Sequence, residues 1–341
     1  MRLLLRVLLL AAVLLGLRLA WVLETQAPLR APGAPSLALV VPPGASADAI
    51  GRQLHELGLV RHPLVFRALV AVRGLGGTLK AGEYQLEGPL SLEQIAELMA
   101  KGEVVRHDLT FPEGKVLEEM AEIADARGIP AAEFLAAARD PALIRDLDPV
   151  ASDLEGYLFP DTYEVPSGTN RGALLVERMV QRFRSVIASL KSDLAAQGLS
   201  LREVVTLASV VERETGRSEE RPRIAAVFRN RLDKKMPLQT DPTVIYALRK
   251  AGRWDGNIRK KDLDIDSPYN TYRRPGLPPG PIASPGREAI LAALHPAAAL
   301  DLYFVSRNDG THQFSLTLTE HERAVDRYQR SRAVKSRNTP S

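Results

Sequence analysis

The chain of 341 residues contains no cysteine, which excludes disulfide bonds, thiol nucleophiles and metal sites with Cys ligands. Its six histidines are scattered, and neither HExxH nor a pair of histidines four residues apart occurs. The phosphate-binding motif GxxxxGK followed by Ser or Thr, the motif GxSxG and a full GxGxxG are also missing. We therefore expect no metal site and no organic cofactor.

The chain also has little excess charge. Its net charge is +4, and the arginines at positions 2, 6 and 18 account for three of these charges, which leaves +1 for all residues after position 23. This balance does not fit a nucleic-acid-binding protein, and we expect no nucleic-acid partner. The length is that of two or three folded units.

The N-terminal 23 residues have the pattern of a membrane-targeting segment. Only eleven uncharged residues, 7–17, follow each other without interruption, as in a cleaved signal peptide. Residues 3–23 are long enough to span a membrane if Arg6 and Arg18 reach opposite interfaces, and no clean cleavage site follows. We favour an uncleaved, single-pass anchor in the inner (cytoplasmic) membrane, with a cytoplasmic N-terminus and the rest of the chain outside the cytoplasm.

The remainder predicts an α+β protein in several parts. These are a spacer at residues 24–36, a small α+β module at 37–105, a connector at 106–150, a mainly helical domain with short strands at 151–333, and a disordered tail at 334–341. Strands are expected at residues 37–41, 84–86, 104–111, 302–305 and around 314. Helices are expected at residues 46–57, 62–72, 91–99, 113–138, 174–196, 200–214, 219–233, from 242, 285–294 and from 319, with Ser218, Ser284 and Thr319 as three of the caps.

The helix predicted at residues 200–214 ends in two carboxylates, Glu212 and Glu214. Gly216 is the expected C-cap, so both glutamates lie in the last turn, where the helix dipole disfavours a carboxylate anion. A raised pKa there would suit an acid catalyst. The two side chains are about 200° apart on the helical wheel, so the pattern does not choose between them. Both can also be ordinary surface charges.

Two other stretches carry polar or aromatic side chains without a clear structural task. Residues 154–165 are dense in aromatics, and Tyr157 among them can belong either to a buried turn or to the wall of a carbohydrate groove. Gln239 precedes a helix whose cap and first turn are supplied by Thr240 or Asp241 and by Pro242, so its side chain is free to bind a sugar amide or hydroxyl. Loops stiffened by six prolines between residues 267 and 286 suit a preformed site.

The runs LEGYLFPDTYEV, LASVVERETG, LQTDPTVIYAL, SPYNTY, GLPPGPIASPG and HPA followed by LYFV occur in this order. Together they resemble the endolytic murein transglycosylase family, the YceG-like proteins, over nearly the whole chain. The resemblance implies a membrane anchor, a LysM-like module at 37–105 and a lysozyme-like catalytic domain at 151–333. In that family the second Glu of the E-x-E pair is catalytic, which corresponds to Glu214.

The resemblance also implies an activity. The expected reaction is cleavage of the β-1,4 bond from MurNAc to GlcNAc within nascent peptidoglycan strands, giving 1,6-anhydroMurNAc ends and terminating strand elongation beside peptidoglycan synthases. Glu214 would act first as acid and then as base. The weaker candidates for the sugar groove are Gln239, Tyr246, Asn270, Tyr272 and Tyr157, each of which can instead be structural.

Two other functions remain open from the sequence. A muramidase-type hydrolase would need a second carboxylate, for which Asp241 and Asp161 are the candidates. A non-catalytic protein that binds the cell wall would bind glycan without turnover.

Overall fold

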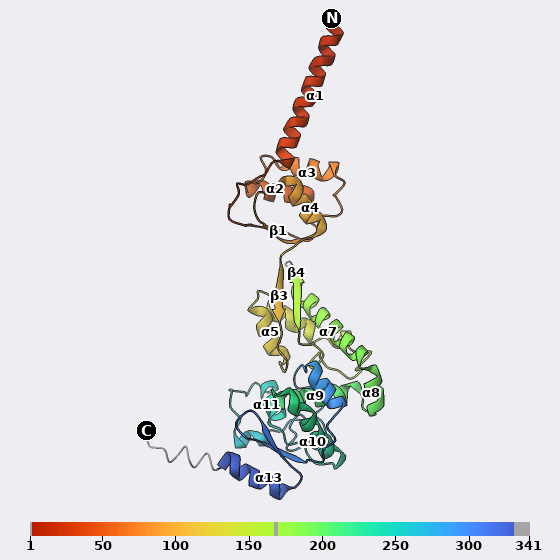
Figure 1. The fold of residues 1–341 in the computed structure, drawn as a ribbon, viewed down its shortest axis with the longest axis vertical. Coiled ribbons are helices and arrows are strands. Elements are labelled where there is room, and N and C mark those ends of the chain that lie inside the picture. The colour runs from red at the N-terminus through yellow and green to blue at the C-terminus, as the bar shows by residue number, and fades with distance from the viewer. Residues whose placement is uncertain (1, 167–169, 331–341) are drawn as a thin grey trace, which may run out of the picture. The chain divides into compact units, whose positions relative to one another are not determined.

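Helix is the main element of this chain, and the strands are few and short (Figure 1). The computed structural model describes residues 2–166 and 170–330. The chain divides into two units, one of Met1–Asp108 with Glu164–Arg171 and one of Leu109–Tyr163 with Gly172–Ser341. The tail expected at 334–341 lies outside the described residues.

The elements of the first unit follow the predicted order. They are α1 (Arg2–Gln26), β1 (Leu37–Val41), α2 (Ala47–Glu56), α3 (Pro63–Val72), β2 (Gly82–Leu86), α4 (Leu92–Lys101) and β3 (Arg106–Thr110), whose end belongs to the second unit. Strand β1 pairs with β2 in antiparallel register, with Leu39 opposite Tyr84. The predicted caps are confirmed, because Ser46 accepts a hydrogen bond from Ala49 N and Ser91 forms a capping box with Gln94.

Helix α1 contains the predicted anchor. Within it, Arg6–Gln26 has a mean hydropathy of 2.2 and is long enough to cross a membrane, which is compatible with a single-pass anchor. The helix continues three residues beyond the predicted end at Leu23. Trp21 packs against the core of the first unit, and Thr25 is buried.

The spacer predicted at 24–36 is partly structured. Its first residues complete α1, and Pro28 then forms an antiparallel bridge with Ser91 of the module. The amide of Leu29 donates to the carbonyl of Leu90 at 3.0 Å. The chain therefore runs along the module here instead of forming an extended linker.

The second unit holds the remaining helices and strands, except that residues 164–166 of β4 and Arg171 of α7 belong to the first unit. Its regular helices are α5 (Leu117–Asp125), α6 (Ala131–Ala138), α7 (Arg171–Ser189), α8 (Lys191–Gln197), α9 (Leu201–Glu214), α10 (Arg221–Asp233), α11 (Asp241–Lys250), α12 (Arg287–Leu294) and α13 (Leu318–Val325). Short helical turns are η1 (Pro141–Leu143), η2 (Ser218–Glu220), η3 (Lys260–Asp264) and η4 (Asp326–Arg330). Strand β4 (Thr162–Pro166) pairs with β3, and β5 (Tyr303–Ser306) with β6 (His312–Ser315).

Helix α9 lies at the centre of this unit. All eight residues from Val204 to Val211 are buried, and α12, α10 and α11 pack against the helix. The predicted start is confirmed, since Ser200 and Glu203 form a capping box. Burial on several sides fixes the direction of α9, and with it the position of the two glutamates at its end.

The predicted end of α9 needs a correction. Thr215 is the C-cap in an extended conformation with φ −141° and ψ 137°, and Gly216 does not adopt a left-handed conformation. Instead, Thr215 Oγ1 accepts a hydrogen bond from Arg217 N at 3.1 Å. A side-chain hydroxyl therefore supports the turn that we assigned to glycine.

Three helix starts differ from the prediction. The helix after α9 begins at Arg221 with Pro222 in its first turn, preceded by the turn η2, so Ser218 is not its cap. Gly286 is the N-cap of α12, because the backbone of Ser284 is bonded to Lys115 instead. The last capping box belongs to Thr317 and Glu320, two residues before the predicted pair.

The long helix predicted at 174–196 is two helices. Helix α7 ends at Ser189 and α8 begins at Lys191, with Leu190 between them at φ −110° and ψ 16°. The hydroxyl of Ser189 donates to the carbonyl of Val186 at 2.6 Å, a local bond that competes with the helical pattern.

Candidate active site at the end of helix α9

Glu212 is occupied by structural contacts. One carboxylate oxygen accepts a hydrogen bond from Arg221 of α10 at 2.6 Å, and the other accepts from the amide of Gly286 at the start of α12 at 3.0 Å. The side chain is only 5% exposed, and burial raises its pKa. Because both oxygens are used, Glu212 ties α9 to α10 and α12 and has no oxygen free for a substrate.

Glu214 has a different environment. Its Oε2 accepts a hydrogen bond from the hydroxyl of Thr240 at 2.6 Å. Among the described residues no group donates to Oε1. The side chain is partly buried at the last residue of α9. Glu214 is thus held through one oxygen and presents the other.

The surroundings of Glu214 favour its protonated form. Burial raises the pKa of the Glu214 carboxyl, and the negative charge of Asp241 adds to this effect. The hydrogen bond from Thr240 and the charge of His312 act in the opposite direction. A carboxyl whose pKa is raised toward neutrality can both donate and accept a proton, which is the requirement for a general acid that later becomes a base.

Thr240 does not serve as the side-chain cap that the sequence predicts. It is the N-cap of α11 by position, but its hydroxyl makes no capping hydrogen bond, and Asp241 and Pro242 form the first turn. The hydroxyl bonds Glu214 instead, while the Thr240 amide is held by Thr271 Oγ1 at 3.3 Å. Sequence analysis missed this role because an N-cap threonine normally turns its hydroxyl to its own helix.

Gln239 lies next to this contact in a strained conformation. Its φ of 52° is in the left-handed region, which costs a non-glycine residue about 1 kcal/mol or more. Its amide donates to the carbonyl of Thr271 at 3.1 Å, and its exposed side chain accepts a hydrogen bond from Arg231 at 2.7 Å. We expected the Gln239 side chain to have no structural partner, and this is wrong for its Oε1, which is bonded to Arg231. No described residue accepts a hydrogen bond from Nε2.

Tyr272 belongs to the same cluster. Its hydroxyl donates to Asp241 Oδ1 at 2.6 Å, and its ring is partly buried. Burial, the hydrogen bond to Asp241 and the charge of Glu214 all raise the pKa of the Tyr272 hydroxyl, so it stays protonated at neutral pH. The structure therefore brings the candidates Glu214, Gln239 and Tyr272 together and adds Thr240 and Asp241.

The β5–β6 hairpin adjoins the same end of α9. Arg217 donates to the carbonyl of Gly310 at 2.9 Å in the hairpin turn. Both oxygens of Glu220 are bonded to His312, one to its amide at 2.9 Å and the other to its ring Nδ1 at 2.7 Å. The sequence shows His312 only as one of six scattered histidines. Its position near Glu214 depends on the hairpin.

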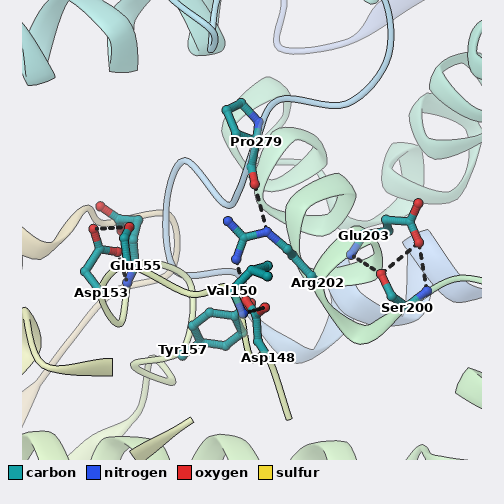
Figure 2. Close-up of polar contacts among 10 residues, drawn as sticks. Asp148, Val150, Asp153, Glu155, Tyr157, Ser200, Arg202, Glu203 and Pro279 are labelled. Carbon is teal, nitrogen blue, oxygen red and sulfur yellow. Dashed lines mark hydrogen bonds and ion pairs between the residues drawn. The ribbon is translucent and has the colours of Figure 1, made fainter. Parts of the chain in front are cut away.

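Three predicted sugar-binding residues lie inside the protein. Asn270 is fully buried, and its amide donates to the carbonyls of Leu263 and Ile265 at 2.8 Å each, so it shapes the loop and is closed to a ligand. Tyr157 is 1% exposed and donates to Asp148 at 2.5 Å, which Figure 2 shows beside Arg202. The aromatic loop is thus a buried turn, and the groove-wall interpretation of Tyr157 is wrong.

Tyr246 is also buried, and its contacts are with Glu155 and Tyr269. Its hydroxyl donates to Glu155 Oε2 at 3.3 Å, and its ring lies 4.8 Å from that of Tyr269. Asp161, one of the two candidates for a second acid, is paired with Arg182 at 2.8 Å. Asp241 is the candidate that lies beside Glu214.

Comparison with known proteins identifies the family of this chain. The sequence model of the YceG-like family matches residues 39–327. This chain belongs to the YceG-like family. A Bacillus subtilis (strain 168) relative named endolytic murein transglycosylase is 36% identical over 304 residues, covering 84% of this chain and 83% of the relative.

A relative of the same name from Streptococcus pneumoniae serotype 2 is 32% identical over 339 residues. The match covers 89% of this chain and 60% of that relative, so this chain spans about three fifths of the pneumococcal protein. The crystal structure of a YceG-like protein from Listeria monocytogenes is 33% identical, with a TM-score of 0.58 over 84% of this chain and 98% of that one.

Proposed function

We propose that this chain is an endolytic lytic transglycosylase of peptidoglycan that cleaves the β-1,4 bond from MurNAc to GlcNAc. The observation that carries the proposal is the contrast between the two glutamates of α9. Glu212 has both oxygens engaged, whereas Glu214 is held by Thr240 alone and presents Oε1. The names of the B. subtilis and S. pneumoniae relatives support the same reaction class.

The proposed mechanism needs one carboxyl group. Protonated Glu214 donates its proton to the bridging oxygen as the bond from that oxygen to C1 of MurNAc breaks. The resulting carboxylate then takes the proton of the MurNAc C6 hydroxyl, and O6 bonds to C1 to form the 1,6-anhydro ring. No water is consumed, and Glu214 ends protonated again.

The neighbours of Glu214 have defined tasks in this proposal. Thr240 orients the carboxyl through Oε2 and leaves Oε1 for the substrate. The free Nε2 of Gln239 is suited to donate to a sugar oxygen, and the Tyr272 oxygen, whose proton goes to Asp241, is suited to accept from a sugar hydroxyl. Arg231 fixes Gln239 in position, so the donor is preorganised at the cost of a left-handed backbone.

A muramidase is the second candidate, because Asp241 lies near Glu214. In that reaction a second carboxylate would attack C1 or activate water. Here Asp241 Oδ1 accepts a hydrogen bond from the Tyr272 hydroxyl, which occupies one of its two oxygens. The lytic mechanism needs no second acid and is therefore preferred.

Product analysis tests the choice. Purified full-length protein in detergent is incubated with nascent glycan strands, and the new ends are examined by mass spectrometry. Anhydro ends, 18 Da lighter than reducing ends (about one water), support the lytic reaction. Reducing ends would identify a muramidase, and glycan binding without new ends would identify a non-catalytic wall protein.

The cellular setting is part of the same proposal. Helix α1 would anchor the chain in the cytoplasmic membrane with the N-terminus inside, and the LysM-like module at 37–105 and the lysozyme-like domain at 151–333 would work outside. Cleavage within strands close to the membrane would terminate their elongation by the synthases.

A further inference from the structure

A second concavity lies in the same unit as Glu214. It has a volume of about 650 Å³ and is lined by residues from four parts of the chain, which meet at the C-terminal end of α11. The lining residues used below are Arg139, Asp153, Glu155, Tyr246, Lys250 and Trp254. The proposed mechanism uses none of them. We call this concavity the Glu155 cleft.

Glu155 is the buried acid of the cleft. The residue is 5% exposed, and its Oε2 accepts long hydrogen bonds from Leu117 N at 3.4 Å and from the Tyr246 hydroxyl at 3.3 Å. Its Oε1 is buried and has no hydrogen-bond partner among the described residues. Buried polar atoms are nearly always bonded, so this oxygen needs a partner that the described residues do not supply.

The form of Glu155 defines what that ligand offers. Burial raises the pKa of Glu155 to about 8, and the nearby acids Asp153 and Glu118 add to the effect. A neutral carboxyl can donate one hydrogen bond from Oε1 to a carbonyl or carboxylate oxygen. The backbone amide of Glu155 donates a hydrogen bond of 3.0 Å to Asp153 Oδ1, which Figure 2 shows. This bond fixes the backbone at Glu155.

The rest of the cleft carries cations and an aromatic side chain. Arg139 is exposed at the end of α6, and among the described residues its guanidinium has no hydrogen bond or ion pair. Lys250 is 3.8 Å from Asp153, and Trp254 is partly buried. One free guanidinium next to a hydrogen-bond donor and a ring suits a short peptide with a carboxylate better than an uncharged sugar.

The distance from Glu214 also fits a peptide. Thr240, which bonds Glu214, immediately precedes α11, and Lys250 at the far end of that helix lines the cleft. Ten helical residues span about 15 Å. An extended peptide of four or five residues spans roughly 13 to 18 Å. A peptide attached to a sugar at Glu214 is therefore long enough to reach the cleft.

We infer that the Glu155 cleft binds the stem peptide carried by the MurNAc residues of a peptidoglycan strand. Arg139 takes a peptide carboxylate, Glu155 donates to a peptide carbonyl, and Trp254 covers the chain between them. The inference rests on the proposed function, because it places the sugar backbone of the same strand at Glu214. Strands that carry peptides would then be cut in preference to bare glycan.

Two substrates and two matched variants test this inference. The substrates are peptide-bearing strands and strands whose peptides an amidase has removed. The variants are Arg139→Glu and, as control, Arg145→Glu, an exposed arginine outside the cleft lining. Arg139→Glu should lower kcat/KM on peptide-bearing strands about tenfold or more, the scale of one charge-assisted hydrogen bond. It should leave the rate on bare strands unchanged.

Equal loss on both substrates, or no loss on either, would overturn the inference. If wild-type protein cuts neither substrate, the proposed function fails, and binding then decides the peptide site separately. Titration of the full-length protein with free stem peptide by calorimetry should give saturable binding that Arg139→Glu weakens and Arg145→Glu does not. Absence of saturable binding to the wild type would reject the cleft as a peptide site.

Discussion

The hydroxyl of Thr240 donates a 2.6 Å hydrogen bond to Oε2 of Glu214, across 26 residues of sequence. This bond stabilises the carboxylate and opposes the effect of burial on the pKa of Glu214. It therefore sets both the direction of the proposed catalytic acid and the pH at which the acid loses its proton. Its removal should change both properties.

Thr240→Val should move the alkaline limb of the pH–rate profile to higher pH. Loss of the hydroxyl raises the pKa of Glu214 further, so the protonated acid persists to higher pH, while loss of orientation lowers the maximal rate. Thr240→Ser should restore both. Because the hydroxyl makes no capping bond in α11, helix stability should change little. An unchanged profile in the valine variant would show that the bond does not tune the acid.

Glu214→Gln should lower strand cleavage by about 100-fold or more, the usual contribution of a general acid. The amide keeps the shape of the side chain but cannot exchange the proton. Thermal unfolding should show an intact fold. The measurement is the initial rate of release of new strand ends.

Glu212→Gln is the matched control, and it should lower stability while it leaves activity almost unchanged. It weakens the contact with Arg221 and should cost about 2–3 kcal/mol of unfolding free energy, the scale for a hydrogen bond to a charged group. Activity per folded molecule should remain close to wild type. If Glu212→Gln is inactive and Glu214→Gln is active, the assignment within the pair is wrong.

Gln239→Ala should lose on the order of 1–3 kcal/mol of transition-state stabilisation, as for one unmade hydrogen bond to the sugar. Gln239→Gly removes the same side chain and also relieves the left-handed backbone. Both variants should lose similar activity, while the glycine variant is the more stable of the two. Melting temperature and rate are measured on one preparation. Activity that follows stability would make Gln239 a structural residue.

Glu155→Gln should flatten the dependence of stability on pH. The folded state holds the Glu155 proton up to about pH 8, whereas an unfolded glutamate releases it near its ordinary pKa of 4.5. Between these values the folded state binds more protons, so stability falls as pH rises, by at most about 5 kcal/mol. Urea unfolding of wild type and variant at pH 5 and pH 8.5 measures the difference. Equal slopes would show that Glu155 is already ionised at pH 7.

The protein should remain in the membrane fraction with its N-terminus intact. Helix α1 is continuous to Gln26, and Trp21 and Thr25 are packed in the first unit. Cleavage near Glu24 would therefore cut the helix in its last turn and remove Trp21 from the core against which it packs. Sequencing of the mature N-terminus checks this, and a start near Glu24 would identify a signal peptide.

Local signals predicted much of the fold. The caps at Ser46, Ser91 and Ser200 were confirmed because each acts within its own helix turn. Glu214 could be separated from Glu212 only by family resemblance, since the contacts of Glu212 with Arg221 and Gly286 depend on how three helices pack. Local sequence carries no such information.

The sugar-binding candidates show the same limit. Asn270 and Tyr157 are polar residues in loops, which is also the pattern of a binding site. Their side chains turn inward because loop carbonyls and Asp148 happen to need partners there. Conversely, Thr240 has the sequence pattern of a helix cap, but its hydroxyl bonds Glu214 instead of its own helix. The direction in which a side chain points depends on its tertiary neighbours, and these are not its neighbours in the sequence.

The hairpin contacts have a consequence for the order in which the enzyme matures. Arg217 holds the hairpin turn at Gly310, and Glu220 holds His312, so the surroundings of Glu214 include residues almost one hundred positions later in the chain. A polypeptide still being synthesised would carry Glu214 before these neighbours are made. Glu214 would then reach its final surroundings only after the β5–β6 hairpin has been synthesised.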